Sequence, residues 1–438
     1  MNRRSSPGRG LALAALALGL AACGQRTPGA PSHLAVWWWG EQEAPGAQSW
    51  MAETVEKYQS AHPDVRIETR LQSTDSLETA FHAAAAARHG PDIQSLWAGL
   101  WTLQEAWEDA LVPTSSLMPE SEYRHYIGND QRRFEGKVWG VGLYLSGTSI
   151  AFNKDLFEKA GLDPDGDYST WPAFLAACAQ LTRAGITPLA GGLADGWLAG
   201  RLWQLLGRQT LDSAADMMQA MTGAAKLTDA RYAAWWSKLA ELKSKGCWNG
   251  DIGTIDYQQA QGLFLRGQAA MIVANDTSYP DWIRQVGKDK IGVMRVPVYG
   301  SGRLAHTYAV TTPGLCITSW SKARTQAADF LRFMHTAERL QAWYAATGLF
   351  PADDRFDAAV IALPQMRQVF TWIKQGPGPD LEDFIPPSVD EQLVTACRLL
   401  FAGTMDAAQC ARQLDMAAAA WRAENPRQME NYRKWIAR

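Results

Sequence analysis

The sequence predicts an α/β protein built from parallel β-α-β units. Short apolar runs bounded by turn residues alternate with longer amphipathic segments, a pattern typical of strands connected by helices. The chain has 438 residues, enough for two or three domains, and 47% of them are hydrophobic, enough for real cores. This composition excludes wholesale disorder and collagen-like repetition. The first expected strands are residues 33–39, 65–71 and 92–97, and helices are expected over about 41–60, 77–88 and 103–110.

A segment of different character follows at residues 136–153, which we expect to be extended and to cross between lobes. The rest of the chain is rich in helix signals, and it has no repeat of fixed period, which excludes solenoids and propellers. The expected helices are residues 153–161, 171–184, 212–223, 229–245, 255–266, 321–335 and 339–347, with a mostly helical tail from about 358. The expected strands are residues 269–274, 291–297 and 315–319.

The first 22 residues are predicted to be a signal segment. Arg3, Arg4 and Arg9 precede a 12-residue apolar stretch, too short for a bilayer that needs about 20 residues. The stretch ends in LAACG, which resembles a bacterial lipobox and predicts cleavage before Cys23 and attachment of a lipid to its thiol. An ordinary cleavage site with an incidental cysteine is the alternative. Residues 23–32 would then be a flexible, lipid-anchored tether, and the protein would be exported to the periplasm or the outer membrane face.

The charge and the cysteines exclude several classes of protein. The formal net charge is −3, or −6 without the three arginines of the signal segment, and no basic cluster indicates a nucleic-acid binder. No C-x-x-C pair is present, so the sequence does not predict a zinc ribbon or a thioredoxin-like site. Cys397 and Cys410 flank an expected helix stop, and we expect either a disulfide between them or two buried thiols.

Catalytic signatures are also missing from the sequence. It contains no G-x-x-x-x-G-K-[ST], H-E-x-x-H or G-x-S-x-G motif, and Gly90-Pro91 ends the one helix that might have carried a histidine pair. We therefore predict no catalytic residue, no metal site and no cofactor. Scattered acidic residues still allow an acid/base pair, as in an exported carbohydrate-active enzyme.

Tryptophan is the strongest compositional feature, with 20 residues. Trp37, Trp38 and Trp39 close the first expected strand, and Trp97 closes the third, with Trp101 shortly after. Indole rings stack on the C–H faces of sugars, and their N–H groups find polar partners. Because side chains alternate along a strand, at least one of the first three must belong to the core.

Residues 152–164 (FNKDLFEKAGLDP) resemble the solute-binding lipoproteins of bacterial ABC importers, in the sugar-binding group that includes maltose-binding protein. Six further segments match that family in collinear order, and together they cover nearly all of residues 33–438. These segments are GPDI at 90–93, FEGKVWGV at 134–141, WPAF at 171–174 leading to AGITP at 184–188, FLRGQAAM at 264–271, the helix at 327–334, and TGLFP at 347–351.

The resemblance implies a two-lobed periplasmic-binding-protein fold with discontinuous lobes, a hinge and a ligand cleft between them. We expect lobe one to contain residues 33–146 and 310–357, and lobe two to contain residues 147–309 and 358–438. The lobes would close around a carbohydrate, and the closed form would dock on the permease subunits of the importer. No enzymatic activity and no nucleic-acid partner are implied, and we expect a monomer held at the membrane by its lipid.

The family pattern also predicts ligand contacts, position by position. The loop after the first strand, the segment after GPDI, the first crossing and the end of the strand at 269–274 line the cleft in this family. In place of the acidic–basic pair of maltose-binding protein, Leu100 and Trp101 stand here, which makes maltose specificity doubtful. The predicted contacts are Trp39, Glu41, Gln42, Trp97, Trp101, Tyr144, Ser146, Asp195, Trp197, Asn275, Asp276, Tyr279, Trp282 and Asp390, with Tyr279 or Trp282 as a stacking ring.

The leading hypothesis is a receptor for a mono- or oligosaccharide. A receptor for a polyol or a glycerophosphodiester is the alternative within the same class, although the candidate contacts contain no Arg or Lys to hold a phosphate. Hypotheses of other classes are an exported carbohydrate-active enzyme and a surface interaction lipoprotein without a small-molecule ligand.

Overall fold

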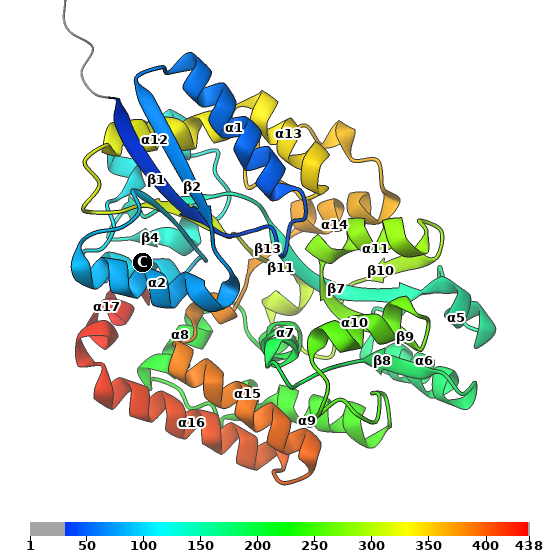
Figure 1. The fold of residues 1–438 in the computed structure, drawn as a ribbon. Helices are drawn as coiled ribbons and strands as arrows, with labels where there is room; N and C mark the ends of the chain where they lie inside the picture. The colour runs from blue at the N-terminus through cyan, green and yellow to red at the C-terminus, as the bar shows by residue number, and fades with distance from the viewer. Residues whose placement is uncertain (1–30, 437–438) are drawn as a thin grey trace, which may run out of the picture.

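The computed structural model describes residues 31–436, so the expected signal segment and Cys23 lie outside the described residues. The chain forms two β-sheets, each flanked by helices, with the C-terminal helices at the lower edge of the view in Figure 1. The predicted mixture of helices and partly parallel sheets is confirmed. Among residues 31–436, no helix has the length and apolar character needed to span a membrane.

The first sheet has five strands in the order β2-β1-β3-β12-β6. β1 is parallel to β2 and β3, whereas β12 is antiparallel to β3 and β6. In β1 the alternate residues Leu34, Val36 and Trp38 are buried, so Trp38 is the core member of the tryptophan triplet, as alternation requires. The bounds are Ser32–Trp38 for β1, Val65–Leu71 for β2, Ile93–Leu96 for β3, Val141–Gly142 for β6 and Gly314–Ile317 for β12.

The second sheet has six strands in the order β13-β11-β7-β9-β8, with β10 also paired to β7. The long strand β7 is antiparallel to β9, β10 and β11, and almost all its residues are buried. The bounds are Ser146–Asn153 for β7, Thr187–Ala190 for β8, Ala269–Asn275 for β9, Ile291–Met294 for β10, Tyr308–Thr311 for β11 and Pro377–Pro379 for β13; β4 (Arg133–Phe134) and β5 (Lys137–Val138) form a separate ribbon.

Helices cover both sheets. Those beside the first sheet are α1 (Ala47–Ala61), α2 (Thr74–Ala87), α3 (Leu100–Trp107), α4 (Glu120–Tyr123), α12 (Arg324–Met334) and α13 (Ala337–Thr347). Those beside the second are α5 (Lys154–Lys159), α6 (Trp171–Arg183), α7 (Trp197–Leu206), α8 (Ala214–Thr222), α9 (Ala230–Ser244), α10 (Tyr257–Leu265), α11 (Tyr279–Val286) and α14 (Pro364–Gln375). The tail is α15 (Pro387–Ala402), α16 (Ala407–Glu424) and α17 (Pro426–Ile436), and short 3-10 turns include η2 (Asn129–Arg132), η3 (Gly207–Thr210), η5 (Arg303–His306) and η7 (Glu382–Phe384).

Three chain segments run side by side between the two sheets. Residues 143–145 connect β6 to β7, and residues 312–313 connect β11 to β12. The third segment, residues 350–352, is tied to the first by bonds from the amide of Leu145 to the carbonyl of Phe350 at 2.8 Å and from the amide of Ala352 to the carbonyl of Leu143 at 3.1 Å. The amide of Leu143 also donates to the carbonyl of Pro313 at 2.8 Å. The connection between the sheets is therefore a narrow, hydrogen-bonded bundle of extended chain.

The C-terminal tail packs across onto α3. Trp107 of α3 lies 6.4 Å from Trp435 of α17 between ring centroids, and Gln104 donates to Gln428 at 3.1 Å. Cys397 on α15 and Cys410 on α16 are free, buried thiols in this packing, and Cys410 Sγ donates to the carbonyl of Ala396 at 3.4 Å. Of the two expected alternatives, the structure has the buried thiols rather than the disulfide.

Candidate functional site

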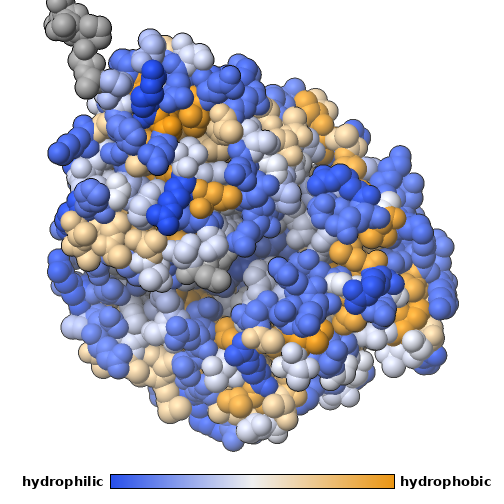
Figure 2. All heavy atoms as spheres, in the orientation of Figure 1, coloured by the Kyte–Doolittle hydropathy of each residue, from blue (hydrophilic) through white to orange (hydrophobic). Residues whose placement is uncertain are grey.

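Three tryptophans meet at the carboxyl ends of β1 and β3. Trp39 and Trp97 lie 5.2 Å apart between ring centroids, and Trp97 and Trp101 lie 5.8 Å apart. Trp39 is buried, whereas Trp97 and Trp101 are half-buried. The molecular surface is hollowed between the part that contains β1, β2 and α1 and the part that contains α7 and α10 (Figure 2). The structure thus brings together three residues that the sequence predicted separately, and we call them the aromatic surface.

A single carboxylate, Glu43, joins the two halves of the molecule. It follows β1, and its Oε2 accepts from the hydroxyl of Tyr144 at 2.8 Å while its Oε1 accepts from Ser146 at 2.6 Å. The same Oε1 accepts from Asn275 at 3.2 Å and from Thr277 at 3.3 Å, both at the end of β9. Tyr144, Ser146 and Asn275 were predicted, and Glu43 and Thr277 are the members of this cluster that sequence reasoning missed.

The two polar residues predicted in this loop have other partners. Glu41 accepts from the amides of Gly46 at 3.0 Å and Gln48 at 2.6 Å, so it caps the start of α1. Gln42 is exposed, and its amide oxygen accepts from the indole of Trp39 at 3.4 Å. The first turn of a helix has free amides that need an acceptor, and α1 begins shortly after this loop. This requirement could have assigned Glu41 to the helix and left Glu43 for the cluster.

Removal of the Glu43 carboxylate should destabilise the fold. In Glu43→Ala the hydroxyls of Tyr144 and Ser146, both buried, lose their acceptor. A buried donor without a partner costs about 1–3 kcal/mol, so we expect the free energy of unfolding to fall by about that amount in urea titrations. Glu56→Ala removes an exposed carboxylate from α1 and should change the stability by less than about 0.5 kcal/mol. Equal stability of both variants would contradict a structural role for Glu43.

Asp195 and Trp197 lie at the start of α7, on the second half of the molecule. Asp195 accepts from the amides of Trp197 at 3.3 Å and Tyr257 at 3.1 Å, which ties α7 to α10. The ring of Trp197 stacks on Tyr257 with 3.7 Å between centroids, and the guanidinium of Arg201 lies 5.7 Å from the ring centre. Half-buried Trp197 therefore has much of its ring occupied by protein neighbours.

Arg201 belongs to a cluster in which carboxyl groups outnumber it. It forms ion pairs with Asp380, at 3.4 Å, and with Glu382 of η7. The predicted contact Asp390 lies near by on α15, where burial raises its pKa to about 6 against the opposing charge of Arg201. The cluster thus offers acceptors for hydroxyl groups rather than a free positive charge.

The remaining three predicted contacts lie in the interior. Tyr279 is 0% exposed and Trp282 is 3% exposed; their rings contact each other, and Trp282 also contacts the core ring of Phe264. Asp276 is 2% exposed and accepts from the amide of Gly147 at 3.0 Å and from the hydroxyl of Tyr308 at 3.2 Å. In this structure neither ring presents a face to a ligand, because α11 turns both of them toward the sheet rather than toward the hollow.

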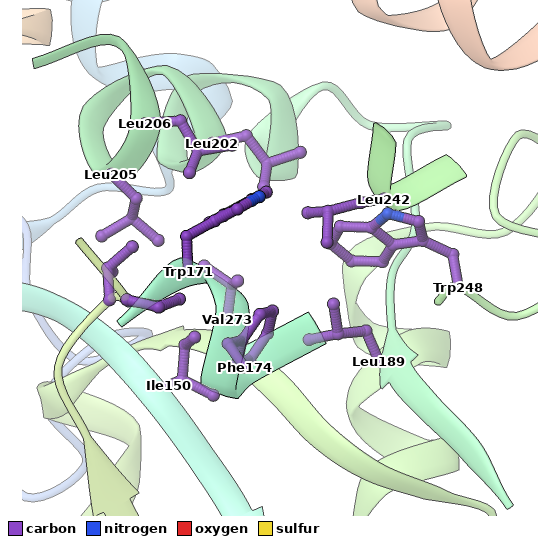
Figure 3. Close-up of a pocket in the computed structure, with 12 residues that line it drawn as sticks. Ile150, Trp171, Phe174, Leu189, Leu202, Leu205, Leu206, Leu242, Trp248 and Val273 are labelled. Atoms are coloured by element: carbon purple, nitrogen blue, oxygen red, sulfur yellow. The ribbon is translucent and has the colours of Figure 1, made fainter. Parts of the chain in front are cut away.

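A cavity in the core of the second sheet is a poor candidate for a sugar site. It is enclosed by apolar side chains that point toward one another, with Trp171 and Phe174 from α6 and three leucines from α7 (Figure 3). Its other walls come from β7, β8, β9, the residues after β10, Leu242 of α9 and Trp248. The lining side chains offer no acceptor for sugar hydroxyl groups, and their polar atoms are the indole N–H groups of Trp171, which donates to Glu241, and of Trp248.

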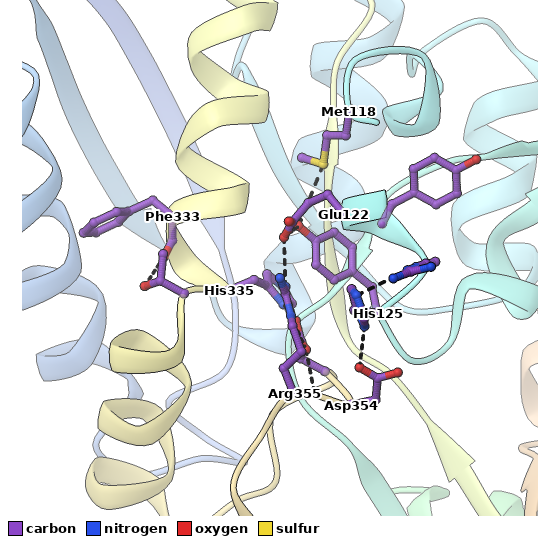
Figure 4. A network of polar contacts seen from close by, with 12 residues as sticks. Met118, Glu122, His125, Phe333, His335, Asp354 and Arg355 are labelled. Atoms are coloured by element: carbon purple, nitrogen blue, oxygen red, sulfur yellow. Dashed lines mark hydrogen bonds and ion pairs between the residues drawn. The ribbon is translucent and has the colours of Figure 1, made fainter. Parts of the chain in front are cut away.

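A buried polar network lies beside the third connecting segment (Figure 4). Asp353 accepts from Nδ1 of His335 at 2.9 Å and from Arg355 at 2.7 and 2.9 Å, and Arg355 also pairs with Glu122 at 2.8 Å. Tyr126 lies against His335 and donates to Glu122 at 3.0 Å. The network holds the residues that follow the third connecting segment, 350–352, against the first half of the molecule. Among the described residues, no group of three or more His, Cys, Asp or Glu side chains is arranged to hold a metal ion.

Comparisons with known proteins agree with this architecture. The family described as bacterial extracellular solute-binding protein matches residues 53–368. Curated relatives include the sn-glycerol-3-phosphate-binding periplasmic protein UgpB of Shigella dysenteriae serotype 1, 27% identical over 212 residues, and of Escherichia coli K12, 26% identical over 211 residues. Each match covers 46% of this chain and 46% of the relative, so the chain spans about half the length of the curated relatives it matches.

Solved structures are similar over most of the chain. A chitin oligosaccharide binding protein superposes with a TM-score of 0.80 and 20% identity, covering 90% of this chain and 100% of that chain. The cyclic alpha-maltosyl-1,6-maltose binding protein of Arthrobacter globiformis has a TM-score of 0.71 and 19% identity, covering 89% and 98%. These likenesses confirm the predicted two-lobed fold.

Proposed function

From the membership of this chain in the bacterial extracellular solute-binding protein family, which spans residues 53–368, we propose that it captures a mono- or oligosaccharide and delivers it to the permease of an ABC importer. The observation that carries the proposal is the aromatic surface of Trp39, Trp97 and Trp101. The faces of indole rings suit the C–H faces of pyranose rings, and the cluster around Arg201 supplies acceptors for hydroxyl groups.

The proposed mechanism is closure of two lobes around the sugar. We place lobe one at residues 33–146 and 310–357 and lobe two at residues 147–309 and 358–438. The three connecting segments at 143–145, 312–313 and 350–352 support this division, because a few extended residues can absorb the rotation of closure. The chain would perform no chemistry on its cargo, in keeping with the binding proteins of its family.

The family implies an exported protein. We propose in addition that the mature chain begins at Cys23, carries a lipid on that residue and acts as a monomer beside its permease. Metabolic labelling with a fatty acid, compared between the full chain and Cys23→Ser, tests the anchor.

A polyol or glycerophosphodiester is the second candidate cargo. It is favoured by the curated relatives, which are named for sn-glycerol 3-phosphate. The ion pairs of Arg201 with Asp380 and Glu382 speak against an anionic ligand beside Trp197, because they neutralise the guanidinium that would hold a phosphate.

Thermal unfolding of residues 24–438 with sugars, polyols and glycerophosphodiesters tests the function. A ligand at a hundredfold excess over its Kd stabilises the native state by about 2.7 kcal/mol. A shift with one sugar that is recovered unaltered supports a receptor. Cleavage of the sugar would indicate an enzyme, and no shift with any compound would favour an interaction protein.

Trp101→Ala should weaken binding of that sugar by about 1 kcal/mol or more, since stacking contributes about 0.5–1.5 kcal/mol beyond the area lost. Calorimetry measures the change. Trp37→Ala is the matched control, because Trp37 is half-buried on β1 but lies against Arg70 rather than in the aromatic surface. If Trp101→Ala binds the sugar with unchanged affinity, Trp101 does not belong to the binding site.

A further inference from the structure

A second cavity lies on the side of the second sheet next to η3, in the same half of the molecule as the apolar cavity. Its polar lining consists of Arg208, Gln209, Arg295, Thr307, Thr148 and Tyr308. These residues come from η3, from the segment after β10, from the start of β11 and from β7. Two of them carry a positive charge, whereas the lining contains no carboxylate.

The positive charges of this cavity are poorly compensated. Arg208 is 3% exposed, its Nη2 donates to the hydroxyl of Thr307, and its Nε has no hydrogen-bond partner. The side chain of half-buried Arg295 has no hydrogen bond or ion pair with any of residues 31–436. Burial lowers the pKa of Arg208 to about 10, and the charge of Arg295 adds to this effect. The charge of Asp380 raises the pKa of Arg208, but Asp380 also forms an ion pair with Arg201.

The cavity is also held in shape by specific contacts. The side chain of Gln209 donates to the carbonyls of Leu205 and Pro297, each at 3.1 Å, and accepts from the amide of Tyr299 at 2.8 Å. These bonds fasten the segment that carries Arg295 to η3. A Cβ atom at Gly378 would lie 2.4 Å from Nη2 of Arg208, so the glycine leaves room for the guanidinium. Two arginines are thus positioned at one cavity at a considerable desolvation cost.

We propose that this cavity is an oxyanion site, in which the guanidinium groups of Arg208 and Arg295 bind a phosphate group. Guanidinium groups match the geometry of phosphate oxygens and form charge-assisted hydrogen bonds with them. The phosphate is either a free ion or the terminal group of a phosphorylated solute. The site is distinct from the aromatic surface and does not depend on the sugar proposed there.

Titration calorimetry with the mature chain in a phosphate-free buffer of constant ionic strength tests this site. The probes are inorganic phosphate, glucose 6-phosphate and glucose, with chloride as the reference anion. We expect saturable binding of at least one phosphate probe to the wild type and an affinity at least about tenfold lower in Arg295→Gln, since a hydrogen bond to a charged group contributes about 1.5–3 kcal/mol. Arg303→Gln removes the same charge from the exposed turn η5 near by and should bind like the wild type.

The outcomes separate the sources of the anion. Binding of inorganic phosphate supports a free ion, and binding of glucose 6-phosphate without inorganic phosphate supports a phosphorylated solute. No saturable binding of either probe to the wild type overturns the proposal, and this result needs no variant to fold. The proposal is also overturned if Arg295→Gln binds phosphate like the wild type, or if Trp101→Ala abolishes phosphate binding. Either result would place the anion at another site.

Discussion

We expect Asp353→Ala to lower the free energy of unfolding by about 3 kcal/mol, because the buried imidazole of His335 loses its acceptor and Arg355 keeps only its pair with Glu122. The carboxylate of Asp353 is fully buried, and it accepts from His335, itself 3% exposed, and from Arg355. Burial alone would raise the pKa of Asp353, but the hydrogen bonds of Arg355 and His335 outweigh it and lower the pKa below the ordinary 3.8. This contribution to stability is therefore present at neutral pH and is lost as the pH falls through the lowered pKa.

The neighbouring residue provides the control. Asp354 pairs with His125 at 2.7 Å, but its side chain is 52% exposed, and exposed pairs contribute about 0–1 kcal/mol. Urea titrations at neutral pH should show a larger loss in Asp353→Ala than in Asp354→Ala. A loss of less than about 1 kcal/mol in Asp353→Ala would mean that the network does not anchor the third connecting segment.

Asp276→Asn should remove a loss of about 3–4 kcal/mol in the free energy of unfolding that the wild type shows as the pH rises. Burial raises the pKa of Asp276 to about 7, so the folded protein binds a proton that the unfolded chain releases near its ordinary pKa of 3.8. The stability that this proton provides is complete below pH 3.8 and is lost as the pH rises through 7. Each unit of pKa difference corresponds to about 1.4 kcal/mol. An asparagine keeps the acceptor for Gly147 and presents an N–H to Tyr308 without a charge.

Urea titrations at pH values near 4.5 and 8 measure this effect. Between these values the stability of the wild type should fall relative to that of Asp276→Asn. Asp281→Asn, a substitution of the partly exposed carboxylate on α11, should retain the pH profile of the wild type. Parallel profiles for wild type and Asp276→Asn would show that Asp276 is ionised in the folded protein.

The sequence predicted most of the fold because its signals are local. Each signal acts over a few residues, as do the alternation in residues 33–39, the turn after Ala87 and the cap at Asn153. The corresponding elements lie within a few positions of their predicted bounds. The helices α7 and α11 were missed, and so were three short strands that depend on partners far along the chain. β8, β11 and β13 have only three or four residues and gain their hydrogen bonds from β9 and β7 or from each other.

The candidate site was predictable to the extent that strand order determines it. The residues that follow parallel strands meet at one edge, and Trp39, Trp97 and Trp101 do so. Side-chain direction within a loop or a helix is not set by strand order. This explains why Glu43 rather than Glu41 gathers the donors, and why Tyr279 and Trp282 face the core.

The position of β12 has a consequence for how the chain acquires its structure. β12, formed by Gly314–Ile317, lies between β3 and β6 in the first sheet, so a strand near residue 315 separates two strands that precede it by more than 170 residues. A growing chain that ends before residue 314 leaves β3 and β6 with unpaired edges. Contacts between such distant segments slow folding, because a long loop must close before they form. The first sheet therefore stays incomplete until residues 314–317 have joined it, so the first half of the molecule depends for its structure on a segment from far along the chain.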